Sequence, residues 1–193
     1  MNLFWGISDH IQTEYDERKT AAAAAYLLSR AGGRMEFIRL IKLLYLADRE
    51  AWGQYERPIT GDSYVSMDNG PVLSRTYDLL KPDAPSGPWS ATIERTGNDA
   101  RLRVEPDLGP LSEAEVDILA ETNDRFSAVP TWGTNGLIDR LHRILPEWEY
   151  PKGTSKPISP EAILSKIGKA DRIKAVRKEL EEIAEFRRLV GSG

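Results

Sequence analysis

The sequence lacks cysteine entirely and has only two histidines in 193 residues. The lack of cysteine excludes a disulfide framework, a thiol nucleophile, an iron–sulfur cluster and Cys-ligated zinc. The two histidines, His10 and His142, are far apart in the sequence, so a metal would have to rely mainly on carboxylates. We therefore expect neither a metal nor a cofactor.

Long apolar runs and an excess of positive charge are missing too. The stretch Ala21 to Leu28 is about half of the ~18 residues that suggest a membrane span, and Met1 to Lys19 is too acidic for a secretory signal. With 26 Lys and Arg against 30 Asp and Glu, the net charge is -4, which disfavours binding to nucleic acid. We expect a soluble, cytoplasmic globular protein without membrane contact.

Familiar catalytic motifs are also absent. The sequence contains no G-x-x-x-x-G-K-[ST], G-x-G-x-x-G, H-E-x-x-H or G-x-S-x-G pattern. Asp139 and His142 are three residues apart and share a helix face, which makes them the one candidate acid–base pair. The favoured interpretation is a histidine that is packed or hydrogen-bonded near Trp148, so we expect no catalytic residue.

Helical patterns dominate the first part of the chain. Residues 16–31 contain the run Ala21 to Ala25, and alanine is the strongest helix former. From Met35 to Trp52, apolar residues cover nearly the whole helical surface, which predicts a helix at the centre of the core. The polar side chains of this helix should therefore find partners; they are Glu36, Arg39, Lys42, Asp48 and Arg49.

Short segments separated by glycine and proline follow. Ser63 to Met67 alternates as a strand does, and the next four residues suggest a turn into a helix over 72–81, with Pro71 at the first helical position. Trp89 to Arg95 and Ala100 to Glu105 also alternate, and the residues between them predict a β-hairpin turn.

The second half of the chain predicts further helices. Ser112 and Glu115 form a capping box at the start of a helix over 113–127. A shorter helix over 135–145 stops at a proline, and residues 151–157 form a loop.

A long helix over 170–190 follows a shorter one that Ser159 caps and Gly168 interrupts. Its apolar residues have a heptad-like spacing; they are Ile173, Val176, Leu180, Ile183 and Val190. The fold class is therefore mainly α with small β elements (α+β): a compact helical domain with a short β-hairpin and a long C-terminal helix.

The same patterns divide the chain into segments. Residues 1–15 form an N-terminal extension, and residues 16–157 form the helical domain, with its hairpin near 89–105. Residues 158–190 form a C-terminal helical segment. Residues 191–193 are interpreted as a linker remnant and excluded.

Charge is unevenly distributed along the C-terminal segment. Six basic residues against Asp171 give +5 over 166–178, whereas four glutamates against two arginines give -2 over the rest. A solvated face with local ion pairs is the favoured interpretation, and docking onto an acidic partner surface or nucleic acid is the alternative.

Three blocks of sequence occur in order and carry a resemblance. They are K-L-L-Y-x-A-D at 42–48, P-x-x-G-D-x-Y at 58–64 and G-P-V-x-S-x-x-Y-D-x-L at 70–80. Together they resemble the Panacea domain, a family of antitoxins often described as SocA-like or phage-associated. The segment from Leu137 to Trp148 resembles a later feature of the family, so the likeness covers roughly residues 17–150.

The resemblance implies an antitoxin that neutralises a cognate protein toxin, encoded by a neighbouring gene, through direct contact and without catalysis. A protease or a second copy of the chain is a further candidate partner. The alternative is a DNA-binding transcriptional regulator of its own operon or of phage origin. The net charge and the lack of a basic recognition helix before residue 160 argue against it.

Polar residues of these motifs lie in or beside apolar stretches, where an unpaired charge costs several kcal/mol, so they should be paired. Two interpretations stay open: a network that docks the β element on the central helix, which is favoured, or a groove that contacts the toxin. The candidate partner-binding residues come from the motifs and from the last helix; they are Lys42, Tyr45, Asp48, Asp62, Tyr64, Tyr77, Asp78, Ile173, Val176, Arg177, Leu180 and Ile183.

Overall fold

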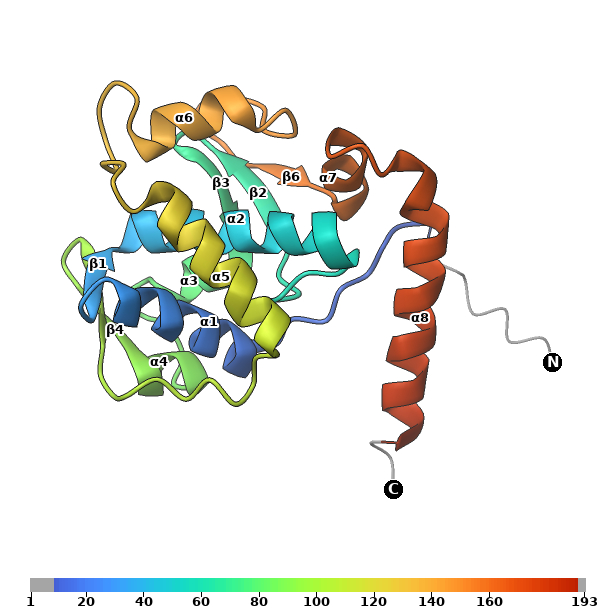
Figure 1. Cartoon of the computed structure of the whole chain (residues 1–193), viewed down its shortest axis with the longest axis horizontal. Helices are drawn as coiled ribbons and strands as arrows, with labels where there is room; N and C mark the ends of the chain where they lie inside the picture. The colour runs from blue at the N-terminus through green and yellow to red at the C-terminus, as the bar shows by residue number, and fades with distance from the viewer. Residues whose placement is uncertain (1–8, 191–193) are drawn as a thin grey trace.

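The structure is a computed structural model that describes residues 9–190, so the predicted tail at 191–193 lies outside the described residues. Helices hold most of the described chain, and two small antiparallel sheets of three strands complete it (Figure 1). This architecture confirms the predicted α+β class with a long C-terminal helix.

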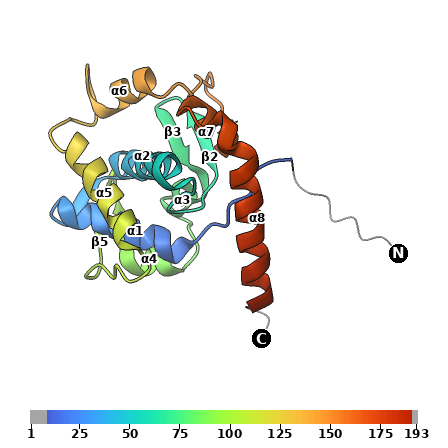
Figure 2. The ribbon, with the colours of Figure 1, turned by 45° about the vertical axis from the view of Figure 1, so that its right-hand side comes forward.

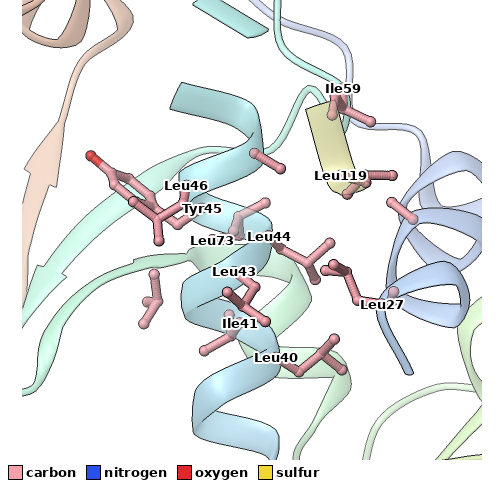
Figure 3. Close-up of a cluster of buried hydrophobic side chains, with 14 of the residues drawn as sticks. Leu27, Leu40, Ile41, Leu43, Leu44, Tyr45, Leu46, Ile59, Leu73 and Leu119 are labelled. Atoms are coloured by element: carbon pink, nitrogen blue, oxygen red, sulfur yellow. The ribbon is translucent and has the colours of Figure 1, made fainter. Parts of the chain in front are cut away.

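Helix α2 (Phe37–Tyr55) forms the centre of the core, as its apolar surface predicts. Leu40, Ile41, Leu43 and Leu44 are all buried, and they pack among side chains from α1, α5 and β3 (Figure 3). Each large apolar side chain buried in this way stabilises the fold by about 1.5–3 kcal/mol.

Helices α1 (Glu17–Arg30) and α5 (Glu113–Phe126) pack against α2, and α5 begins at the capping box that the sequence predicts. Asp16 accepts a hydrogen bond from Lys19 N at 2.9 Å, and Ser112 and Glu115 form the capping box. The alanine run of α1 is buried, because small side chains let neighbouring elements approach closely.

The sheet of β2 (Tyr64–Met67), β3 (Gly70–Leu73) and β6 (Lys156–Ile158) lies against the other side of α2 (Figures 1 and 2). The helix predicted over 72–81 is wrong at its start, since α3 (Ser74–Leu79) begins only after β3. Met67 pairs with Gly70, so the chain turns in two residues and Pro71 lies in an edge strand, where its missing N–H is tolerated. The predicted loop at 151–157 is partly wrong as well, because β6 pairs with β2.

The second sheet has the order β1 (Arg34–Glu36), β5 (Asp99–Leu102), β4 (Ile93–Thr96). The predicted hairpin is confirmed, but both strands are shorter than predicted: the first begins only at Ile93 and the second ends at Leu102. Pro88 starts the short helix α4 (Pro88–Thr92) instead, and Gly87 N donates to Ser90 Oγ at 2.9 Å to cap it. The central helix also starts later than predicted, since Met35 belongs to β1 and pairs with Ala100.

Helix α6 (Leu137–Ile144) covers the end of the β2–β3 sheet, and α7 (Pro160–Lys166) buries Ile163 and Leu164 against the core (Figure 1). A 3-10 turn, η1 (Ala170–Arg172), then leads into α8 (Ile173–Val190), so the helix predicted from residue 170 begins three residues later. Helix α8 stands beside the rest of the molecule rather than across it (Figures 1 and 2).

Residues 9–16, here called the strap, connect α8 to the helical body. Arg177 donates to Asp9 O at 2.8 Å, Ile11 is buried in the core, and Asp16 N donates to Thr60 O at 3.0 Å. The strap passes very close to Gly61, where a Cβ would lie 2.0 Å from Glu14 O. The glycine of the second sequence block thus makes room for the strap.

Replacing Gly61 by Ala is expected to destabilise the protein by at least about 2 kcal/mol. Gly61 has φ +67°, which strains an L side chain, and the new methyl group would meet the strap backbone. Gly97→Ala is the matched control, because Gly97 has φ +61° with nothing within 4 Å of its Cβ position. Urea unfolding measures both, and equal losses would contradict the strap contact.

Candidate functional site

The polar residues of the sequence motifs gather in the interior, between α2, the β2–β3 sheet and the segment after α6. Lys42, Tyr45, Arg49 and Trp52 follow one another along α2 at three- and four-residue steps, so they line one side of the helix. Asp48 lies next to this line and faces the loop that leads to β2. We call this set of buried polar residues and their partners the interior network.

Asp48 is fully buried and accepts four hydrogen bonds. Ile59 N and Thr60 N donate to Oδ1 at 2.9 and 3.0 Å, and the hydroxyls of Thr60 and Tyr64 donate to Oδ2. Burial raises the pKa of Asp48 to about 6, while the bonds from Thr60, Tyr64 and Ile59 act in the opposite direction. Asp48 therefore fixes the loop after α2 to the helix.

Tyr64 connects Asp48 to the rest of α2. Its hydroxyl donates to Asp48 Oδ2 at 3.1 Å and accepts from Trp52 Nε1 at 3.0 Å. Its ring meets that of Tyr45 edge to face, with 5.6 Å between the centroids. Burial and the neighbouring Asp48 carboxylate raise the pKa of Tyr64 well above its usual value.

Asp62 holds the first turn of α3. Its carboxylate accepts from Arg75 N at 3.0 Å, from Thr76 N at 2.8 Å and from the Thr76 hydroxyl at 2.7 Å. These backbone groups lack partners within the helix, and the negative charge favours the positive end of the helix dipole. Asp62 thus caps a helix whose own cap residue, Leu73, has no side-chain acceptor.

Glu147 is the partner that the sequence analysis missed. It is buried, and it accepts from Tyr45 Oη at 2.9 Å and from Arg49 Nε at 2.6 Å, with Arg49 Nη2 at 3.3 Å. The paired charge connects the segment after α6 to α2. The signal in the sequence is an acid between Pro146 and Trp148, at the end of the segment that resembles the later feature of the family.

Lys42 is buried without an opposite charge. Its amine donates to Pro71 O at 2.8 Å and forms no ion pair with any residue in the described range 9–190. Burial lowers the pKa of Lys42 to about 7. A Cβ at Gly70 would lie 3.5 Å from Lys42 Nζ and 3.6 Å from His142 Nε2, so both nitrogens lie beside this glycine.

His142 is the packed histidine that the sequence predicts. Its ring stacks on Trp148 with 4.1 Å between centroids and 12° between planes, and Trp148 Nε1 donates to Met67 O at 2.9 Å. Burial and the neighbouring Lys42 lower the pKa of His142. Asp139 is not hydrogen-bonded to His142; its carboxylate accepts from Asn135 N at 2.7 Å and lies 3.1 Å from Arg143.

The predicted site residues therefore fall into two groups. The structure brings together Lys42, Tyr45, Asp48, Asp62 and Tyr64, all buried. Each has a hydrogen-bond partner, as expected, but Lys42 has only a backbone carbonyl and no opposite charge. This burial supports the interpretation of a network that docks the β element on the central helix.

The second group lies away from the interior network. Tyr77 is half-buried, and Asp78 is exposed and pairs with Lys81. The α8 residues lie on the strap side of the molecule, with Val176 buried and the others partly exposed; these are Ile173, Arg177, Leu180 and Ile183. A role of either group in partner binding stays a prediction.

Residues 9–190 contain neither a cluster of metal ligands nor a membrane-spanning helix. Within that range, no three His, Asp or Glu side chains lie together as a set of metal ligands. No described helix is both long enough and apolar enough to cross a membrane.

The fold and the interior network define a helical α+β domain whose motif residues hold the β2–β3 sheet, α3 and the segment after α6 on one central helix. The sequence model of the family described as antitoxin SocA-like, Panacea domain, matches residues 40–149, the part of the chain that holds most of this network. The chain belongs to this family, which confirms the resemblance and gives the protein a general role as an antitoxin. No curated protein and no solved structure matches the chain significantly.

Proposed function

We propose that this protein neutralises a cognate protein toxin by binding it directly, without catalysis. The match of the family over residues 40–149 carries this proposal. The interior network supports a binding role as well, because its ionisable groups are engaged in holding elements together. Asp48, Asp62 and Glu147 each accept several hydrogen bonds from neighbouring elements.

The buried motif residues contribute to binding through the shape that they maintain. With Lys42, Asp48 and Tyr64 inside the molecule, a toxin contacts the surface around them rather than these side chains. We further propose that the segment 158–190 supplies the surface particular to this chain, because α8 lies outside the matched range and most of its side chains are at least partly exposed.

Co-expression tests this proposal. The product of the neighbouring gene should stop growth when it is expressed alone in the cytoplasm, and the present chain should restore growth and co-purify with it. A toxic neighbour that is neither neutralised nor bound would contradict direct binding. The Glu94→Ala variant is a suitable control, since Glu94 is exposed on the edge strand β4 and is not among the candidate partner-binding residues.

A further inference from the structure

Helix α8 touches the molecule mainly through its first turns. Val176 is its only fully buried residue, and its residue contacts concentrate on α7 and η1. The rest of α8 runs alongside the helical body, as Figures 1 and 2 show from two directions. The inner apolar residues of α8 are therefore only partly covered; they are Leu180, Ile183 and Ala184.

A groove of about 340 Å³ lies between this part of α8 and the body. On the α8 side it is lined by the three inner residues just named. The rest of the lining comes from the body and the strap. It includes Pro58 and Pro110, the edge of the buried Ile59, strap residues 12–14 and several polar side chains of the body. A helix with its side chains is about 10–12 Å across, so this volume suits a few apolar side chains rather than a whole helix.

Most charged residues that line the groove already have partners. Lys19 lies 2.6 Å from Glu115, and Glu14 lies 3.4 Å from Arg187. The backbone of α1 engages the carboxylate of Asp16, which accepts from Lys19 N. The charges of these residues are therefore already balanced by their partners.

Arg57 is the exception. It lines the groove, its side chain is exposed, and it makes no hydrogen bond or ion pair with another residue of the described part of the chain. A guanidinium binds a carboxylate through two parallel hydrogen bonds, and this pairing gives direction as well as energy. An occupant that places a carboxylate beside apolar side chains would thus complement the groove.

We propose that the groove between α8 and the body takes a segment of the toxin that inserts one or two apolar side chains against Leu180 and Ile183 and places an Asp or Glu on Arg57. This inference rests on the proposed function and names the contact surface for it. Helix α8 then acts as one wall of the binding site, and the strap fixes the spacing between the two walls through Asp9 and Glu14.

A second apolar area on α8 competes with this assignment. Phe186, Leu189 and Val190 are 66%, 72% and 63% exposed in the last five residues of the helix. Leu189 is six residues from Ile183, which places it on a different side of the helix. The two surfaces can therefore be separated by substitution.

The test compares four variants of the full chain for binding to a non-toxic variant of the purified neighbouring gene product. Ile183→Glu should weaken binding at least 100-fold, because it places a charge in an apolar contact, whereas Leu189→Glu should change it less than threefold. Arg57→Glu should weaken binding at least tenfold and Arg57→Lys less, since lysine keeps the charge but loses the paired geometry. Unchanged circular dichroism and thermal unfolding establish that each variant is folded.

Hydrogen exchange on the unaltered chain provides a second measurement that needs no variant. Residues 57–61 and 180–187 should exchange more slowly in the complex. If the complex forms but Ile183→Glu binds like the unaltered chain, or protection is confined to other residues, the groove assignment is wrong and the antitoxin proposal stands. If the unaltered chain does not bind the toxic product at all, the proposed function fails and the groove assignment fails with it.

Discussion

Replacing Asp48 by Ala is expected to lower the free energy of unfolding by about 3–5 kcal/mol, a large part of the stability of a domain of this size. The substitution removes the acceptor for Ile59 N, Thr60 N and the hydroxyls of Thr60 and Tyr64. Each buried donor without a partner costs about 1–3 kcal/mol, and a cavity adds to this. Urea unfolding at pH 7 measures the loss.

Two further variants control this prediction. Asp48→Asn keeps one oxygen acceptor and the shape of the side chain, so it should cost about half as much. Asp78→Ala removes an exposed aspartate that pairs with the exposed Lys81, so it should stay within about 0.5 kcal/mol of the unaltered chain. A loss below about 1 kcal/mol for Asp48→Ala would mean that Asp48 does not hold the loop to α2.

The second large effect concerns the pH dependence caused by Lys42. Its pKa is about 7 in the folded protein against 10.5 when exposed, so the unfolded chain binds more protons between these values. The lysine therefore destabilises the fold at neutral pH, and stability rises as the pH increases from about 7 toward 10. The unaltered chain should gain roughly 3–5 kcal/mol across this window relative to Lys42→Met.

Unfolding of both chains at a series of pH values checks this. The difference between them removes the contribution of tyrosines that titrate near the top of the range. Lys81→Met is the control, since Lys81 is largely exposed and should give no comparable rise. A difference that stays constant from pH 7 to pH 10 would show that Lys42 is not buried as a neutral amine.

Asp48 adds a pH dependence of its own at acidic pH. Its folded pKa of about 6 is above the ordinary value of 3.8, so its contribution to stability is present below pH 4 and is lost as the pH rises through 6. Burial thus favours the neutral form of both Asp48 and Lys42, which lie on the same helix. They do not pair with each other: Asp48 accepts from neutral donors, and Lys42 donates to a carbonyl.

Local signals in the sequence predicted the helices well. The capping box at Ser112 and the serine cap at Ser159 act through contacts within a few residues, so their effect is visible in the sequence. The helix predicted to start at Pro71 was wrong because a proline fits both the first turn of a helix and an edge strand. Only the pairing of Met67 with Gly70 decides between the two, and the pairing of β6 with β2 is likewise a contact between distant residues.

The candidate site was predicted only in part. The need for partners followed from placing Asp48 and Lys42 among apolar residues, but their partners are remote in sequence or are backbone atoms. Glu147, about a hundred residues after Tyr45, could not be assigned from spacing. The strap that passes Gly61 was equally hidden, because a positive φ and a close backbone contact are not visible in composition.

The central claim is that the protein acts by holding its toxin and does not alter it. Titration of the purified toxin with the purified chain, followed by dissociation of the complex, tests this most directly. Toxin activity should fall in proportion to the chain added until the two are stoichiometric, and the released toxin should have its original mass and activity. Loss of activity at far lower amounts of the chain, or a released toxin of changed mass, would contradict the claim.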